Sequence, residues 1–205
     1  MEALDYSDDG DLAPEEAGRQ AVYGFLARVL ARPATRAECG FAAPLAGEET
    51  ALNQAFAEFR KVLESVPAEQ MERCYHDLFI GVGRGELLPY ASFYLTGFLN
   101  EKPLASLRGD LEALGFARAE GVHEPEDHIA SLCDVMAQLI DGTARGEFDV
   151  YTQDRFFNTH IRPWAKQFFA DLEAAKSTDL YAPVGRIGNI FMGIEEESFG
   201  MIARA

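Results

Sequence analysis

Two short segments of the sequence carry residue types that could do chemistry. The first, residues 75–94, contains a turn with Gly81, Gly83 and Gly85, followed by tyrosines and a serine. The second, residues 123–128, reads His-Glu-Pro-Glu-Asp-His. A glycine-rich turn can cradle a phosphate, whereas imidazoles beside carboxylates can bind a metal ion or transfer protons. Either segment could therefore form the centre of a functional site.

The glycine turn lacks the sequence of a nucleotide-binding loop. Residues 81–85, Gly-Val-Gly-Arg-Gly, have no Gly-Lys-Ser/Thr, and they follow a helical pattern where a phosphate loop would follow a strand. A GTP-responsive switch would need tight nucleotide binding, which this turn does not predict. Loops held between rigid elements often carry recognition, so the segment predicts a binding loop.

The second segment supports three interpretations. Its proline presets the first turn of a helix, where the acids that follow would favour the positive end of the helix dipole. Asp127 beside His128 could orient an imidazole for catalysis, although no Gly-x-Ser-x-Gly motif supplies a nucleophile. The same pair could ligate a metal ion in a helical phosphohydrolase, with His76 and His160 as the only histidines outside the segment.

Peptide binding is the remaining interpretation of the two segments. A helical protein with an aromatic groove suits an apolar or amphipathic peptide, and carboxylates pair well with arginine. The aromatic candidates are Tyr75, Phe79, Tyr90, Phe93, Tyr94 and Trp164. The acidic candidates are Asp77, Glu86, Glu124, Glu126 and Asp127.

The elements that must position these residues are helices throughout. Apolar residues recur at helical spacing, and prolines and glycines interrupt the pattern. No alternation of apolar and polar residues predicts a strand. We expect one all-α bundle of about eight to ten helices over residues 14–205, with an acidic flexible arm at 1–13. The predicted helices cover about 14–32, 35–43, 48–65, 67–80, 90–100, 103–114, 125–141, 152–160, 161–176 and 184–199.

The composition restricts the partners and the compartment. A length of 205 residues fits one domain. The formal net charge of −16 argues against nucleic acid. It is compatible with a basic partner, and the alternative is that the charge serves only to keep the protein soluble. Cys39, Cys74 and Cys133 are widely spaced, which is typical of a reducing compartment. The acidic beginning is not typical of a secretory signal, and no apolar run predicts a membrane span. We therefore expect a cytoplasmic protein without direct membrane insertion.

Four motifs in this order resemble those of the TorD/DmsD-type redox-enzyme maturation chaperones, the family related to NarJ. The resemblance covers roughly residues 15–175. The motifs are Tyr75-x-x-Leu78-Phe79, Glu86-x-x-x-Pro89-Tyr90-x-Ser92-x-Tyr94, Glu124-Pro125-x-Asp127-His128 and His160-x-x-Pro163-Trp164. They are similar to the family's aromatic-x-x-Leu-Phe element, its Glu-x3-Pro-Tyr-x-Ser-x-Tyr signature, its Glu-Pro-x-Asp-His motif and a pattern in a later helix.

The resemblance implies a TorD/DmsD-like helical fold without enzymatic activity. It implies binding to the twin-arginine signal peptide of a molybdenum-containing oxidoreductase, and support for cofactor insertion and maturation before export. In this family, residues equivalent to Tyr90, Ser92, Asp127 and His128 are associated with leader binding. Some members are associated with weak GTP binding or with domain-swapped dimers, so a monomer and a swapped dimer both stay open.

These observations together predict a peptide-binding site with no catalytic residue, no metal and no resident cofactor. The alternative is a metal-dependent phosphohydrolase centred on Asp127 and His128. The predicted peptide-binding residues are Tyr75, Leu78, Phe79, Glu86, Pro89, Tyr90, Ser92, Tyr94, Glu124, Asp127, His128 and Trp164.

Overall fold

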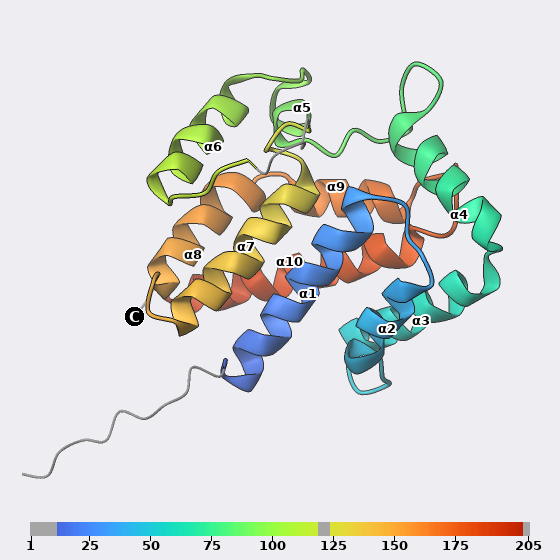
Figure 1. Ribbon diagram of the computed structural model, residues 1–205, viewed down its shortest axis with the longest axis horizontal. Coiled ribbons are helices and arrows are strands. Elements are labelled where there is room, and N and C mark those ends of the chain that lie inside the picture. The colour runs from blue at the N-terminus through green and yellow to red at the C-terminus, as the bar shows by residue number, and fades with distance from the viewer. Residues whose placement is uncertain (1–11, 119–123, 203–205) are drawn as a thin grey trace, which may run out of the picture.

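The computed structural model describes residues 12–118 and 124–202 (Figure 1). Residues 1–11 of the predicted arm and His123 lie outside these residues. The described helices are α1 (Pro14–Ala31), α2 (Ala37–Ala42), α3 (Ala51–Ser65), α4 (Ala68–Tyr75), α5 (Ala91–Thr96), α6 (Lys102–Ala113), α7 (Ile129–Ala144), α8 (Val150–Phe156), α9 (Ala165–Glu173) and α10 (Ala182–Ile202).

Short turns of other helix types extend three of these helices. A 3-10 turn, Ala43–Leu45, follows α2, and π-helical turns, His76–Ile80 and Phe157–Ile161, follow α4 and α8. Extended pairing within the described residues is limited to an isolated antiparallel bridge between Tyr90 and His128. The prediction of an all-α fold is confirmed. None of the described helices combines the length and apolar character needed to cross a bilayer.

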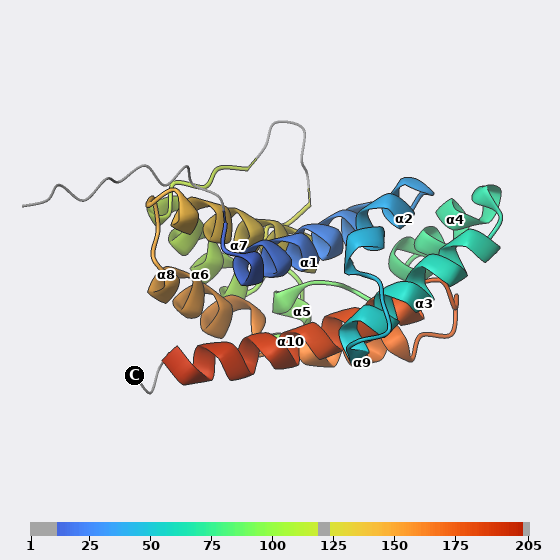
Figure 2. The same cartoon turned by 90° about the horizontal axis from the view of Figure 1, so that it is seen from below.

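The helices form two layers. In the first layer α1 packs along α7, and in the second α10 packs against α9 and α3. Figure 2 shows the two layers edge-on, with α1 and α7 above α10 and α9. Tyr23 of α1 meets Phe191 of α10 edge to face, with ring centroids 4.7 Å apart. The hydrophobic core lies between these layers.

The apolar stripe of α1 faces this core as its spacing predicts. The residues of the stripe, Val22, Phe25, Leu26, Val29 and Leu30, are all buried. Phe25 packs edge to face on Phe56 and Phe59 of α3, with centroids 4.9 and 5.0 Å apart. Such aromatic pairs contribute about 0.5–1.5 kcal/mol each beyond the area that they bury.

Two glycines explain how α10 forms despite its weak helix propensity. A Cβ at Gly185 would lie 2.3 Å from the backbone nitrogen of Glu173, and one at Gly188 would lie 2.2 Å from the ring of Phe169. These glycines therefore allow α10 to approach α9 closely. Packing supplies the stability that their propensity lacks.

A buried ion pair joins the two layers. Arg19 of α1 donates two hydrogen bonds of 2.8 Å to the carboxylate of Glu195 on α10, and Tyr23 donates a third, of 2.9 Å. Arg19 also donates to Gln153 of α8 at 3.0 Å. Glu195 is fully buried. Through these contacts Arg19 links α1 to both α10 and α8.

Two predicted boundaries of the helix in the second segment are wrong. The helix α7 begins at Ile129 and not at Pro125, because the preceding backbone is extended where it pairs with Tyr90. His128 is its N-cap, with Nδ1 accepting a hydrogen bond from the Ala130 N–H at 3.1 Å. The helix continues through Gly142 to Ala144.

Two other predicted boundaries need correction. The helix α5 ends at Thr96 and does not reach Asn100, because Gly97 adopts a left-handed conformation with φ of +83°. The helix α8 begins at Val150 and not at residue 152, because Asp149 is its N-cap and the Asp149 carboxylate accepts the Thr152 N–H at 2.7 Å. A left-handed glycine therefore ends α5, and a side-chain cap begins α8.

Candidate functional site

The two segments singled out in the sequence lie side by side. The N–H of Ala91 donates to the carbonyl of Asp127 at 3.0 Å, and the N–H of Ile129 donates to the carbonyl of Pro89 at 2.9 Å. These two bonds flank the bridge between Tyr90 and His128. Helices α5 and α7 therefore begin from one shared backbone junction.

The buried side chain of Asp127 lies at the centre of this junction. Its Oδ2 accepts the backbone N–H of Ser92 at 2.8 Å, so Asp127 caps the first turn of α5. Its Oδ1 has no hydrogen-bond partner among the described residues, and neither has the Ser92 hydroxyl. Asp127 is 1% exposed and Ser92 is fully buried. A buried carboxylate oxygen and hydroxyl without partners destabilise a fold, and they often mark a functional site.

Tyr90 and His128 form the rim of the junction. Their rings meet edge to face with centroids 5.1 Å apart, and the Tyr90 hydroxyl donates to the carboxylate of Glu124. Burial, and then the hydrogen bond to Glu124, raise the pKa of Tyr90. Burial lowers the pKa of His128 to about 4, so this ring is neutral at pH 7. Because Nδ1 accepts from Ala130, the hydrogen of the neutral ring lies on Nε2.

A cavity of about 200 Å³ opens beside Asp127. It lies between α5, α6, α7 and the π-helical turn that follows α8. Its walls are mainly apolar, with Leu95 from α5, Leu107 from α6 and Leu132 from α7. Asp127 and His160 supply polar groups. The cavity can therefore take a group that is cationic at its end and apolar along its length.

A hydrogen bond between His160 and Asp110 holds α6 over this cavity. His160 Nε2 lies 2.7 Å from Asp110 Oδ2, and His160 is buried whereas Asp110 is about half exposed. Burial lowers the pKa of His160, and the Asp110 carboxylate partly offsets that effect. Arg108 of α6 also pairs with Glu126 at 3.0 Å. The sequence points to His160 as part of a motif and as a spare histidine for a metal site, but nothing in the sequence places Asp110 beside it.

The glycine turn folds tightly on itself. A Cβ at Gly81, where φ is +62°, would lie 2.1 Å from the carbonyl oxygen of Arg84. A Cβ at Gly85 would lie 2.4 Å from the backbone of Phe79. The Arg84 guanidinium lies over the ring of Phe93 at 5.1 Å. The glycines are therefore required by this backbone geometry, and no phosphate need be invoked to explain them.

Glu86 attaches the turn to the second layer. Its carboxylate accepts the backbone N–H groups of Lys176 and Ser177, each at 2.7 Å, in the connection between α9 and α10. Partial burial acts to raise the pKa of Glu86, but these hydrogen bonds outweigh burial and lower it. The predicted peptide contact of Glu86 stays a prediction beside this positioning role.

The aromatic candidates do not line one groove. Tyr75 and Phe79 pack on Tyr181, the residue before α10, with centroids 6.2 and 5.7 Å apart. Tyr94 packs instead on Trp164 at 5.3 Å. Tyr75 and Phe79 pack into the core from the beginning of the first segment, and Tyr94 packs into it from the end of that segment. Tyr75 and Tyr94 are only partly buried, so part of each ring remains at the surface.

Two of the predicted site residues lie inside the core. Leu78 is fully buried and Trp164 is 3% exposed. The Trp164 indole N–H donates to the carbonyl of His160 at 2.8 Å, and so holds the wall of the cavity beside Asp127. Leu78 and Trp164 can therefore position the site, while Asp127, Tyr90 and Glu124 carry the polar groups at its junction.

Nothing observed supports the phosphohydrolase alternative. No group of three or more His, Cys, Asp or Glu side chains that could hold a metal ion occurs within residues 12–118 and 124–202. The carboxylate of Asp127 bonds to α5, whereas the imidazole of His128 bonds to its own helix. Burial raises the pKa of Cys133, so this thiol is not an activated nucleophile.

A protein-family comparison matches the part of the chain that holds both segments. The family model for the nitrate reductase delta subunit matches residues 46–170, more than half of the chain. Chaperone protein TorD of Vibrio cholerae serotype O1 (strain ATCC 39541 / Classical Ogawa 395 / O395) is 32% identical over 123 residues, which cover 57% of this chain and 56% of that protein.

Two further relatives carry the same name. Chaperone protein TorD of Aliivibrio fischeri (strain ATCC 700601 / ES114) is 36% identical over 100 residues, or 45% of this chain and 46% of that protein. Chaperone protein TorD of Photobacterium profundum is 32% identical over 113 residues, or 51% of this chain and 52% of that protein. The chain thus spans about half the length of the curated relatives that it matches.

Proposed function

The chain belongs to the nitrate reductase delta subunit family, which is the TorD/NarJ family, and from this premise we propose that it is a maturation chaperone for a redox enzyme. The client is a molybdenum-containing oxidoreductase that is exported after its cofactor is inserted. The chaperone binds the client's twin-arginine signal peptide in the cytoplasm and delays export until the client is mature. It performs no catalysis of its own.

One observation carries this proposal: Asp127 lines a cavity, and its buried carboxylate has an oxygen without a partner among the described residues. A guanidinium group is the natural complement of such an oxygen, because its N–H donors match a carboxylate. A twin-arginine leader supplies two guanidinium groups followed by an apolar stretch. Phosphate groups and other acids would be repelled at the same place.

The charge of the protein supports the same partner. The formal net charge of −16 attracts a cationic peptide and speeds its encounter with the surface. Several acids are already paired within the described residues, including Glu126 with Arg108 and Arg118. The partner should therefore recognise the unpaired oxygen of Asp127 and not acidity in general.

Apolar burial supplies most of the affinity in this proposal. Burying about 300 Å² of the leader contributes roughly 7 kcal/mol at ~25 cal/mol per Å². Ordering a flexible peptide costs several kcal/mol, which the contacts of its arginines partly offset. We therefore expect a dissociation constant in the micromolar range, consistent with a chaperone that must release its client.

Recovery of the client from the native cell tests this function. We expect the tagged protein to co-purify with the precursor of an exported molybdenum enzyme whose leader is intact, and the mature enzyme to be absent. A partner without a twin-arginine leader would contradict the proposal. Stoichiometric manganese, iron or zinc in the purified protein, together with turnover of a phosphoester, would instead favour the phosphohydrolase.

A further inference from the structure

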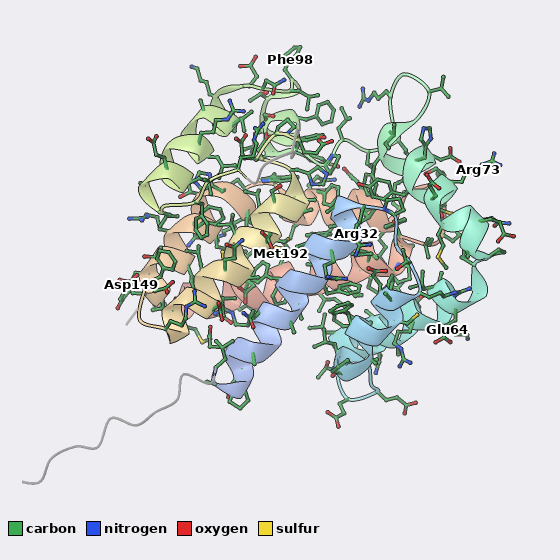
Figure 3. The ribbon with its side chains drawn as sticks, viewed as in Figure 1. Arg32, Glu64, Arg73, Phe98, Asp149 and Met192 are labelled. Carbon is green, nitrogen blue, oxygen red and sulfur yellow. The ribbon has the colours of Figure 1, made fainter. Side chains whose placement is uncertain are left out.

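An exposed apolar surface adjoins the cavity beside Asp127. We name it the α5 patch, and it consists of Leu95, Phe98 and Leu99, which are 44%, 69% and 42% exposed. Leu95 belongs to the patch and to the wall of the cavity, so the two features are continuous. Figure 3 shows Phe98 at the outer edge of the molecule, away from the core. An apolar surface in this position contributes little to the fold.

The backbone of the α5 patch is firmly held. The Thr96 hydroxyl donates to the carbonyl of Ser92 at 2.7 Å and accepts the N–H of Phe98 at 3.2 Å. Gly97 and Asn100 adopt positive φ angles of +83° and +59°, which turn the chain sharply at this point. The patch is thus fixed to α5, whose first turn is in turn held by Asp127.

We propose that the α5 patch binds the apolar stretch of the leader while the preceding arginine enters the cavity at Asp127. This inference rests on the proposed function and assigns the two halves of the leader to two adjoining surfaces. Residues 93–99 carry no charged side chain, whereas the cavity contains the buried carboxylate of Asp127. The two adjoining surfaces therefore match the two halves of a leader, which has a cation next to an apolar stretch.

The length of α5 sets the spacing along the leader. Six residues of helix span roughly 9 Å at about 1.5 Å per residue. An extended peptide covers that distance in about three residues, at ~3.3 Å each, and a helical peptide covers it in about six. Phe98 should therefore contact the leader about three to six residues after the arginine held by Asp127.

A second exposed apolar site offers a matched control. Ile80 is 55% exposed, and Val82 at the tip of the glycine turn is fully exposed. Neither residue lines the cavity beside Asp127. Substitutions there remove a similar apolar surface without touching the proposed path of the leader.

A double-mutant cycle tests the α5 patch. The proteins are the wild type, the double variant Phe98→Ser with Leu99→Ser, and the control Ile80→Ser with Val82→Ser. The peptides are an intact twin-arginine leader and the same leader with serines in its apolar stretch. We expect the Phe98/Leu99 variant to bind the intact leader at least about tenfold more weakly, and the serine leader as the wild type does. The control should bind both peptides like the wild type.

Each contrary outcome has a distinct meaning. If the wild type binds the intact leader and the Phe98/Leu99 variant binds it equally, the α5 patch is excluded while the proposed function stands. If the wild type binds no twin-arginine leader, the proposed function fails. If the same substitutions lower the mass of the peptide-free protein in sedimentation equilibrium, the patch is a contact between two copies and the inference is overturned.

Photo-crosslinking tests the direction of the leader. A benzoylphenylalanine in place of Phe98 should crosslink to leader residues on the carboxyl side of the arginines, about three to six positions away. Crosslinks confined to the amino side of the arginines would overturn the proposed direction. Circular dichroism of each variant verifies that the helices are intact, which we expect because the substituted side chains are exposed.

Discussion

Asp127 holds Ser92 across 35 residues of chain, through a 2.8 Å hydrogen bond from the Ser92 N–H to the Asp127 carboxylate. This contact fixes the start of α5 against the start of α7. It also leaves the second carboxylate oxygen and the Ser92 hydroxyl without partners among the described residues. The same two residues therefore hold the site together and supply its polar groups.

Replacing Asp127 with asparagine should weaken leader binding while the fold persists. The amide oxygen of asparagine still accepts the Ser92 N–H, but the negative charge is lost. A hydrogen bond to a charged group contributes about 1.5–3 kcal/mol, so affinity should fall roughly 10- to 100-fold by calorimetry. Asp179→Asn makes the same charge change at an exposed position and should bind normally. Equal affinities for wild type and Asp127→Asn would remove Asp127 from the site.

Replacing Ser92 with alanine should separate stability from function. Its hydroxyl is buried without a partner in the described structure, so removing it should leave the free energy of unfolding unchanged or raise it by up to about 1 kcal/mol. Leader binding should weaken if this hydroxyl contacts the peptide. Urea denaturation and calorimetry measure the two effects. A loss of more than about 1 kcal/mol of stability would show that the hydroxyl is already satisfied in the free protein.

The pH dependence of stability should reveal His128. Burial lowers its pKa to about 4 from 6.5, so the unfolded chain binds a proton more readily than the folded protein. The neutral His128 ring therefore contributes fully to the free energy of unfolding above pH 6.5. This contribution is lost as the pH falls from 6.5 towards 4, by about 3 kcal/mol in total.

His128→Asn provides the matched comparison for this titration. Asparagine can still cap α7 but cannot take up a proton. Urea titrations at several pH values should show the difference in unfolding free energy between wild type and variant changing across this window. A difference that stays constant from pH 7 to pH 4 would mean that His128 does not titrate as a buried neutral ring.

The buried ion pair should be essential for stability. Glu195→Gln leaves the largely buried Arg19 with only the more exposed Glu16 as a counter-charge, and breaking a buried pair typically costs about 3–5 kcal/mol. The neighbouring residue Glu197 is exposed, so Glu197→Gln should change the free energy of unfolding by less than about 0.5 kcal/mol. Urea denaturation compares the two. Similar small effects for both variants would indicate that α1 and α10 pack without help from the pair.

The sequence predicts those features that arise from local spacing. The stripe of α1 and the all-α fold follow from apolar periodicity, because residues spaced at i, i+3 and i+4 share one buried face only when the chain is helical. The start of α7 could not be predicted in the same way. Pro125 favours a helix locally, but the backbone that follows pairs with the chain around Tyr90, and that contact is distant in sequence.

The candidate site was predicted only in part, for the same reason. The motifs identify Tyr90, Ser92 and Asp127, and the structure brings these three residues together. The pairing of His160 with Asp110 depends on how α6 folds over the cavity, which no local pattern encodes. The exposure of Phe98 and its neighbours could not be predicted either, since exposure of an apolar side chain is a property of the folded surface.

Calorimetric titration of the protein with twin-arginine leaders tests the central claim most directly. The matched peptide is the same leader with both arginines replaced by glutamine. We expect a micromolar dissociation constant for the arginine leader and binding at least about tenfold weaker for the glutamine form. Equal affinity for the two forms, or no heat with any of several arginine leaders, would contradict recognition of a twin-arginine signal peptide.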